Sequence, residues 1–168
     1  MMTIIGISGK KQSGKDEVFH IIKKHRPTAV RIAFADEVKR EVAQATNCTI
    51  EYMEARKDVF RTIYQWWGTD FRRNLCNPYY WCDRWLDTIH KLQHDAIVVT
   101  PDIRFLDEVE LFHDMGQPVW RIKRGLIITD THASETELDN YEFPLTINNN
   151  GTLAKLENRV LQLLETVI

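Results

Sequence analysis

The hydrophobic and polar positions of the chain fall into two alternating kinds of segment. Short apolar runs rich in β-branched residues predict five strands, at residues 2–8, 29–35, 97–101, 118–123 and 145–148. Segments with apolar residues at helical spacing lie between strands, as in 15–25, where Val18, Ile21 and Ile22 share one face. This alternation predicts an α/β fold of three layers, in which a central parallel sheet of about five strands is covered by helices on both faces.

Two longer segments complete the predicted fold. Residues 152–167 predict an amphipathic helix whose inward-facing residues are Leu153, Leu156, Val160, Leu163 and Val167. Residues from about 36 to 93 break the alternation, because they read as wholly helical and are rich in aromatic residues and Arg. We interpret them as a substrate-binding insertion carried on a single domain that spans residues 1–168.

Composition narrows the class of protein. Hydrophobic residues make up 43% of the 168 positions and charged residues 27%, which is typical of a globular domain. No apolar run approaches the roughly 20 residues that span a bilayer, and the short apolar N-terminus does not read as a signal peptide. We therefore expect no membrane partner and a cytoplasmic location. The odd number of cysteines (Cys48, Cys76 and Cys82) fits a reducing compartment.

Charge distribution argues for a small ligand. The formal net charge is −2, and acidic residues closely follow each local basic cluster. A protein that grips a polynucleotide normally carries a basic excess or stripe. We therefore expect small anionic ligands and no nucleic-acid partner. The assembly state stays open at this point, with a homodimer among the options.

Residues 8–18, "SGKKQSGKDEV", resemble the glycine-rich loop that cradles nucleotide phosphates. Gly9, Gly14 and Lys15 match that pattern, with a predicted strand before them and a predicted helix after them. Glycines let backbone N–H groups wrap around phosphate oxygens, and the helix adds its positive dipole end. Lys15 would bring an ammonium group to the outer phosphates. We interpret the segment as a phosphate loop; an ordinary glycine-rich turn is the alternative.

Asp16 departs from the usual pattern, which has Ser or Thr after the lysine. One interpretation is a favourable acid in the first turn of a helix. The other, which we favour, is that Asp16 holds Mg²⁺ directly or through water. Ser13 offers a further hydroxyl nearby.

The helical insertion collects residues suited to a nucleotide. Arg61 and Gln65 lie one helical turn apart, and together with Arg72 or Arg73 they could receive a phosphate and a base edge. Trp81 could stack on a base. Core packing is the simpler interpretation for any single aromatic residue, and it is the one that the helical spacing favours for Tyr64, Trp67 and Phe71.

The segment "IVVTPDIRFLDEVE" places charged residues where a buried strand ends. In a parallel sheet this end should face the phosphate loop. Asp102 could then orient a metal ion, and Arg104 could neutralise charge on a transferring phosphoryl group. The alternative is a helix N-cap at Asp102, a solvated Arg104, and ordinary first-turn acids at Asp107 and Glu108.

The remaining polar segments predict a lid and a turn. Arg121, Lys123 and Arg124 leave the fourth strand toward the ligand side and could serve a lid at about residues 124–140. Ser134 and Glu137 fit a capping box. The stretch "INNNGT", which contains Asn149 and Gly151, predicts a turn whose backbone could frame an adenine.

These stretches together resemble the phage-type deoxynucleoside monophosphate kinases, within the phosphate-loop kinase superfamily. The matching pieces run in the family's order over nearly the whole chain: "SGKKQSGKD", "RTIYQWWGTDFRRN" with the "YYW" that follows it, "VTPDIRFLDEVE", "TDTHASE" and "INNNGTLAKL". The family loop itself reads S-G-K-D, so Asp16 is its ordinary form. The resemblance implies ATP as phosphoryl donor, Mg²⁺ as cofactor and a deoxynucleoside 5′-monophosphate as acceptor, in a host cytoplasm if the chain comes from a phage.

The resemblance also assigns residues to sites. It implies that Lys15, Asp16, Asp102 and Arg104 carry the reaction. The ATP site would comprise Gly9, Ser13, Gly14, Lys15, Asp16, Arg124, Asn149 and Gly151. The acceptor site would comprise Arg61, Gln65, Gly68, Thr69, Trp81, Asp102, Arg104 and Glu108.

One departure from the family concerns the metal. Members often have a hydroxyl residue after the Asp, and this chain has Glu17, which places more weight on Asp16 and Ser13. Two rival functions remain at this point: a phosphate-loop kinase for another small metabolite, and a non-catalytic nucleotide-binding protein.

Overall fold

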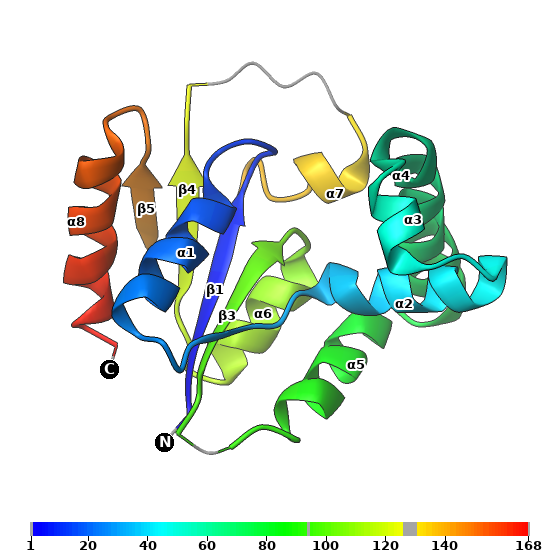
Figure 1. Ribbon diagram of the computed structural model, residues 1–168, viewed down its shortest axis with the longest axis horizontal. Helices are drawn as coiled ribbons and strands as arrows, with labels where there is room; N and C mark the ends of the chain where they lie inside the picture. Colours follow the sequence, from blue (N-terminus) through cyan, green and yellow to red (C-terminus); the bar gives the residue numbers. More distant parts are fainter. Residues whose placement is uncertain (1, 94, 126–130, 168) are drawn as a thin grey trace.

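The computed structural model describes residues 2–93, 95–125 and 131–167. Within these residues, five strands form one parallel sheet in the order β2-β3-β1-β4-β5. The strands are β1 (Thr3–Gly9), β2 (Val30–Arg31), β3 (Ile97–Ile103), β4 (Val119–Lys123) and β5 (Leu145–Asn148). Because every pairing is parallel, all carboxyl ends meet at one edge, which is at the top of Figure 1. The predicted parallel sheet is confirmed.

Helices cover both faces of the sheet. On one face, α1 (Lys15–His25) and α8 (Leu153–Leu164) pack against Ile5, Ile7 and Trp120. On the other, α5 (Tyr80–Ile89) and α6 (Leu106–Asp114) pack against Ile4 and Val98. Successive residues of a strand point to opposite faces, so each short apolar run supplies both cores. The predicted three-layer α/β/α architecture is confirmed (Figure 1).

The segment between β2 and β3 is helical, as predicted. It contains α2 (Phe34–Thr46), α3 (Ile50–Glu54), α4 (Lys57–Gln65), the π-helix η1 (Trp66–Cys76) and α5. Its helices α2, α3 and α4 lie beside the sheet, on the side of β2 and β3 (Figure 1). In none of the described helices is there a stretch long and apolar enough to cross a membrane.

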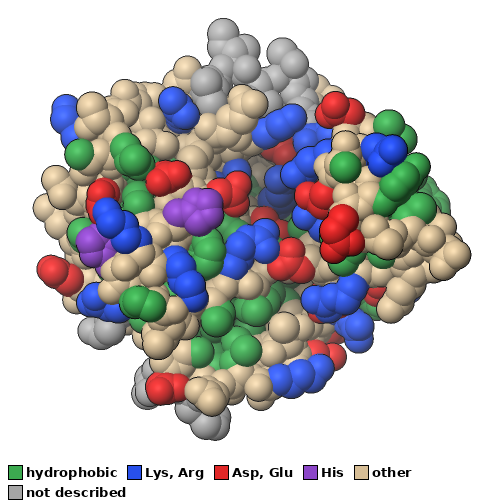
Figure 2. Space-filling model, viewed as in Figure 1, with side chains coloured by type: hydrophobic (Ala, Val, Ile, Leu, Met, Phe, Trp, Pro, Cys, Tyr) green, Lys and Arg blue, Asp and Glu red, His purple; other side chains and the backbone are tan. Residues whose placement is uncertain are grey.

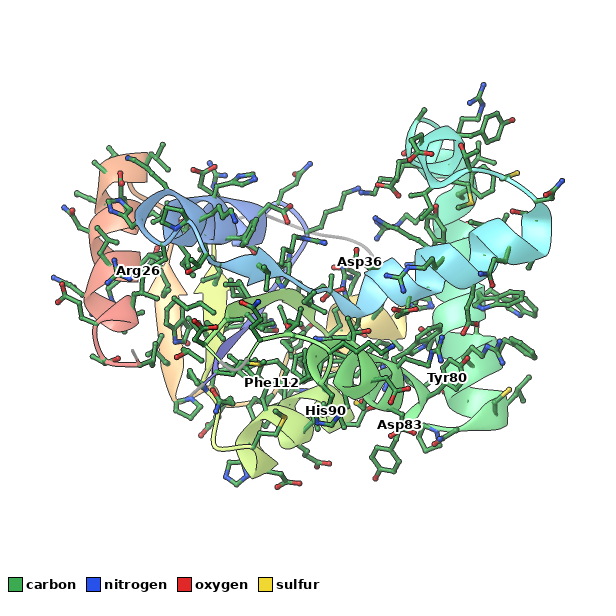
Figure 3. All side chains as sticks on the ribbon, turned by 60° about the horizontal axis from the view of Figure 1, so that its bottom comes forward. Arg26, Asp36, Tyr80, Asp83, His90 and Phe112 are labelled. Atoms are coloured by element: carbon green, nitrogen blue, oxygen red, sulfur yellow. The ribbon has the colours of Figure 1, made fainter. Side chains whose placement is uncertain are left out.

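Glu41 of α2 joins three parts of this helical segment. Its carboxylate accepts hydrogen bonds from Trp67 Nε1 (2.9 Å), Arg72 Nε (2.7 Å) and the Tyr80 hydroxyl. Burial opposes the charged form, but these donors outweigh it and hold the pKa of Glu41 below its usual range. Tyr80, labelled in Figure 3, is the first residue of α5. The contacts fix α2, η1 and α5 to one another, which gives the insertion a defined shape.

The second predicted strand, 29–35, is too long. β2 ends at Arg31 and α2 already begins at Phe34. Asp102, at the far end of β3, accepts hydrogen bonds from the backbone N–H groups of Phe34 (3.1 Å) and Ala35 (2.8 Å). Asp36, labelled in Figure 3 at the start of the same helix, accepts from Ala33 N at 3.2 Å. These carboxylates satisfy the free N–H groups of the first turn, so the chain turns into a helix early.

The final helix also differs from its prediction in one position. Leu156, Val160 and Leu163 are buried as expected, and Val167 packs partly buried against the same core. Leu153 is 57% exposed, so its predicted inward orientation is wrong. It is the first helical residue after the N-cap Thr152, whose hydroxyl accepts from Lys155 N, and at this position the side chain lies beyond the core.

The predicted capping box at Ser134 and Glu137 is wrong. The short helix α7 (Ala133–Thr136) is capped by His132, whose Nδ1 accepts from Ser134 N at 3.1 Å. Glu137 turns instead to the start of α6, where its carboxylate accepts from Leu106 N at 2.8 Å. A contact between distant segments has therefore replaced the local one.

Candidate active site

The glycines of residues 8–16 are required by the shape of the loop. A Cβ at Gly9 would lie 2.6 Å from Ser13 Oγ and 2.7 Å from the Ile122 carbonyl oxygen. Gly14 has φ +103°, and a Cβ there would lie 2.3 Å from Asn149 Nδ2. That region of φ is open mainly to glycine. The loop leaves β1 at Gly9 and enters α1 at Lys15, which is the strand–loop–helix order of a phosphate loop.

Lys15 and Ser13 present polar groups inside this loop. Lys15 Nζ donates to the carbonyl oxygens of Gly9 (2.8 Å) and Lys10 (2.7 Å). Burial, and then the charge of Arg104, lower the pKa of Lys15 to about 8. Ser13 is 2% exposed, and its Oγ has no hydrogen-bond partner in the described chain. A half-buried cation and a hydroxyl without a partner in the same loop suit the binding of an anion.

Asp16 lies in the first turn of α1 and lines the cavity described below. Across the described ranges, no group of three His, Cys, Asp or Glu side chains could hold a metal ion by itself. Mg²⁺ commonly takes one or two protein carboxylates and completes its shell with phosphate oxygens and water. The exposed carboxylate of Asp16, beside the phosphate loop, fits that mode of binding.

A cavity of about 330 Å³ opens beside the loop. All eight residues predicted for the acceptor site line it, although they come from α4, η1, α5, the end of β3 and α6. These residues are Arg61, Gln65, Gly68, Thr69, Trp81, Asp102, Arg104 and Glu108. Lys15 and Asp16 line the same cavity. The fold therefore brings the predicted acceptor residues together against the phosphate loop.

The cavity is strongly cationic. Among the described residues that line it, eight are Lys or Arg and four are Asp or Glu, in a chain whose net charge is −2. Figure 2 shows Lys and Arg side chains gathered around a hollow between the sheet and the helices α2 to α4. Such a concentration of positive charge favours a ligand with several negative charges.

The inner wall of the cavity is rigid. Arg73 is 7% exposed and forms ion pairs with Asp107 and with Glu108, the latter at 2.8 Å. Burial raises the pKa of Glu108 to about 8, against the opposing influence of Arg73. Trp81 is 3% exposed, and its Nε1 donates to the Gly68 carbonyl oxygen at 2.7 Å. A buried, hydrogen-bonded network of this kind holds the residues around it in one arrangement.

The two neighbouring arginines of η1, Arg72 and Arg73, take different directions. Arg72 bonds Glu41 and does not line the cavity, whereas Arg73 does. Of the three aromatic residues expected in the core, Tyr64 and Trp67 are half-buried and pack against a core cluster, as expected. Phe71 is half-buried, and Tyr64 also lines the cavity. The π-helix widens the backbone repeat from i→i+4 to i→i+5, so the spacing rule of an α-helix does not apply beyond Gln65.

Asp102 has structural contacts through both of its oxygens. Both of its oxygens accept hydrogen bonds from the first turn of α2, as described above. Burial raises its pKa, opposed by the Ala35 N–H and then by Arg104. Asp102 therefore caps α2, and not the helix that follows it in sequence. It still lines the cavity.

Arg104 is half-buried and paired, and its partner is a residue that the sequence did not single out. Its guanidinium Nη1 pairs with the carboxylate of Glu135 and also donates to the Ser134 carbonyl oxygen at 3.1 Å. Arg61 Nη2 lies 3.5 Å from the same Glu135 carboxylate. Glu135 is one acid in a polar stretch, and no local pattern distinguishes it. The ion pairs that distinguish Glu135 exist only in the folded chain.

The residues predicted for ATP belong to the loop itself, to the start of α1, and to the segments that follow β4 and β5. Asn149 Nδ2 donates to the Ser13 carbonyl oxygen at 2.8 Å, and Gly151 lies in the turn between β5 and α8. Gly9, Ser13, Gly14, Arg124, Asn149 and Gly151 do not line the cavity. Arg124 is exposed just after β4. Residues 126–130 of the predicted lid lie outside the described residues.

Arg121 does not serve a lid. Its side chain is buried, its Nη1 donates to Ser8 Oγ at 2.8 Å, and its Nη2 lies 3.8 Å from Asp139. In the register of the sheet it lies beside Ser8. Arg121 therefore supports β1 just before the phosphate loop.

This fold and site define a phosphate-loop kinase. Solved structures share the fold: shikimate kinase from Acinetobacter baumannii has a TM-score of 0.51 at 13% identity, over 99% of this chain and 94% of that one. The tunicamycin resistance protein of Deinococcus radiodurans has a TM-score of 0.55, also at 13% identity, over 98% and 96% of the two chains. At such identities the likeness extends to the fold alone.

Sequence comparison gives the family. The family model for deoxynucleotide monophosphate kinase matches residues 50–160. The chain therefore belongs to the deoxynucleotide monophosphate kinase family. A candidate deoxynucleotide monophosphate kinase of Acanthamoeba polyphaga mimivirus is 24% identical over 185 residues, which cover 95% of each chain. The deoxynucleotide monophosphate kinase of Escherichia phage RB69 is 34% identical over 109 residues, 62% of this chain and 44% of that protein.

Proposed function

We propose that this protein transfers the γ-phosphoryl group of ATP to a deoxynucleoside 5′-monophosphate, giving ADP and the deoxynucleoside diphosphate. The chain's family supports the reaction. The observation that carries the assignment of the site is the cationic cavity beside the phosphate loop, which all eight expected acceptor residues line. A kinase with two anionic substrates needs two adjoining anion sites, and the loop and the cavity supply them.

In this proposal the donor binds to the phosphate loop. The backbone N–H groups around Gly14, the hydroxyl of Ser13 and the ammonium of Lys15 receive its phosphates. Asp16 would hold Mg²⁺ together with the phosphate oxygens, and the ion would supply further positive charge against them. Arg124, Asn149 and Gly151 would lie on the nucleoside side of the donor.

The acceptor would bind in the cavity. Arg61 would receive its phosphate and Gln65 its base edge, because both project from α4 into the cavity. Trp81 would lie against the base, held in position by its bond to the Gly68 carbonyl oxygen. The helical segment of residues 36–93 would thus carry the acceptor, and residues 124–140 would act as a lid that excludes water.

Phosphoryl transfer depends on how the protein positions the two substrates and on the positive charge it supplies, more than on covalent chemistry by the protein. Lys15 and Arg104 line the cavity at the loop, where negative charge would develop between donor and acceptor. Asp102 would keep α2, and with it the acceptor site, fixed against the end of β3.

The experiment that tests the proposal measures ADP release from ATP and Mg²⁺ with a panel of acceptors: the four deoxynucleoside monophosphates, their ribonucleotide counterparts, shikimate, and no acceptor. We expect release that depends on a deoxynucleoside monophosphate. Lys15→Ala should lower kcat by about 100- to 1,000-fold, as for the loss of one group that stabilises the transition state. Lys91→Ala, an exposed lysine away from the cavity, is the matched control. Equal release without acceptor would refute the proposal.

A further inference from the structure

Glu135 is a buried acid among cations. Its side chain is 2% exposed, and acids are almost never so buried unless they are paired. The partners are Arg104, at the end of β3, and Arg61, on α4. Glu135 itself belongs to α7. A single carboxylate therefore joins three segments that are far apart in sequence, and it does so inside the cavity.

The backbone of α7 has contacts of its own, in addition to those of that carboxylate. Lys10, in the phosphate loop, donates to the Glu135 carbonyl oxygen and pairs with Asp139. Arg104 Nη1 donates to the Ser134 carbonyl oxygen. Figure 1 shows α7 between the carboxyl edge of the sheet and α4. The carboxylate of Glu135 consequently has a defined position between the loop and the helical segment.

Electrostatics explains why an acid at this position is useful. Lys15, Arg61 and Arg104 all line one cavity, and like charges in a poorly solvated site repel one another. Burial and then Arg104 lower the pKa of Lys15, and Glu135 opposes this lowering more than Asp16 or Asp102 does. Without Glu135, the two arginines would lose the anion that draws them together.

We propose that Glu135 is a positioning residue for phosphoryl transfer: its carboxylate holds Arg104 and Arg61 in the orientation in which they meet the donor and acceptor phosphates. This inference rests on the proposed function, and Glu135 takes no part in a covalent step. It requires that correct placement of the arginines outweighs the repulsion between the Glu135 carboxylate and the phosphates. If Glu135 were instead an anion that competes with nucleotide for the phosphate site, its removal would raise the affinity for both nucleotides.

The first test is Glu135→Gln, which keeps the size of the side chain and removes its charge. We expect kcat to fall about 100-fold, the cost of misplacing a reacting group by roughly 1 Å. KM for the acceptor should rise, because Arg61 loses its alignment. KM for ATP should rise less, because the donor site loses only the influence of Glu135 that keeps Lys15 charged. Glu135→Asp keeps the charge on a shorter side chain and should recover part of kcat. Glu142→Gln, an exposed acid of the same segment, should match the wild type.

A second test shows whether Glu135 acts through Arg104. In an Arg104→Lys background the side chain that Glu135 aligns is already altered, so adding Glu135→Gln should lower kcat by no more than about threefold. A residue with only a structural role would lower kcat by the same factor in both backgrounds. Melting temperatures of all variants, measured alongside, report any loss of folded protein separately.

Three outcomes would overturn the inference. One is a kcat of Glu135→Gln within twofold of wild type, whether or not the melting temperature falls. The second is an unchanged kcat with lower KM values for both nucleotides, which would assign Glu135 as a competing anion. The third is an equal loss in both Arg104 backgrounds. Wild-type turnover is assayed in parallel, so a wild type that is inactive with every acceptor refutes the proposed function instead.

Discussion

The phosphate loop and the cavity beside it are built in opposite ways. The loop is a local structure, because its shape follows from the backbone conformations that Gly9 and Gly14 permit. The cavity is a tertiary structure, in which Arg61, Arg104 and Glu135 meet from three separate segments. We infer that donor binding is encoded within a few residues, whereas acceptor binding depends on how the helical segment docks. Mutations that change KM for one substrate and leave KM for the other unchanged test this difference.

We expect the largest difference between the effects on the two KM values in Arg61→Ala. Loss of a charged hydrogen bond costs about 1.5–3 kcal/mol, so KM for the acceptor should rise about 10- to 150-fold. KM for ATP should stay within about threefold, because the loop does not depend on α4. Arg56→Ala, an exposed arginine in the same helical segment, is the control. Equal increases in the two KM values would show that the sites are not separate.

Asp16→Asn tests the donor side. It keeps the shape of the side chain and removes the charge that would hold Mg²⁺, so the half-saturating Mg²⁺ concentration should rise on the order of tenfold. The neighbouring acid Glu17 does not line the cavity, and Glu17→Gln should leave the magnesium titration unchanged. If Asp16→Asn also leaves it unchanged, Asp16 is only a favourable first-turn acid.

Trp81→Phe sharpens the account of the acceptor side. The variant keeps an aromatic face but loses the bond from Nε1 to the Gly68 carbonyl oxygen. A hydrogen bond contributes about 0.5–1.5 kcal/mol, so KM for the acceptor should rise about 2- to 12-fold with KM for ATP unchanged. Trp66→Phe, at an exposed tryptophan outside the cavity, is the control. A lower melting temperature with both KM values unchanged would leave Trp81 a core residue only.

The smallest expected effect is a pH dependence of donor binding, through Lys15. The folded-state pKa of Lys15 is about 8, below its ordinary value of 10.5, because of burial and then Arg104. Between these values the unfolded chain binds a proton that the folded chain has lost, so this group makes the ligand-free protein more stable as pH rises.

The same loss of charge should weaken ATP binding. From about pH 7 to about pH 9, KM for ATP should rise by several-fold, while Arg61 stays charged and KM for the acceptor changes less. Steady-state kinetics at fixed ionic strength measure both constants. A KM for ATP that is constant over this range would contradict the role of the Lys15 charge.

The same division between local and tertiary structure decides what the sequence could predict. The strand, loop and helix of residues 3–25 follow from local periodicity and glycine positions, and α1 has the predicted bounds. The early start of α2 could not be predicted, because the cap comes from Asp102, 67 residues further along. Glu135 was missed for the same reason, because its partners are supplied by other segments.

The residues predicted for the acceptor came from family resemblance more than from physics. Spacing on an α-helix correctly places Arg61 and Gln65 on one face. It could not distinguish Arg72 from Arg73, because a π-helix follows and its residue spacing differs. No pattern in the sequence announces such a helix. The folded cavity is therefore the better guide to which arginines face the substrates.

The central claim is that a phosphoryl group passes from a donor on the loop to a deoxynucleotide in the cavity. The most direct test follows the group itself, using ATP labelled at its γ-phosphate with Mg²⁺ and each deoxynucleoside monophosphate in turn, and separating the products by chromatography. We expect label in a deoxynucleoside diphosphate. The label should be lost in Lys15→Ala and restored in Arg61→Ala by raising the acceptor concentration. Label that appears only in inorganic phosphate, at the same rate with and without acceptor, would contradict it.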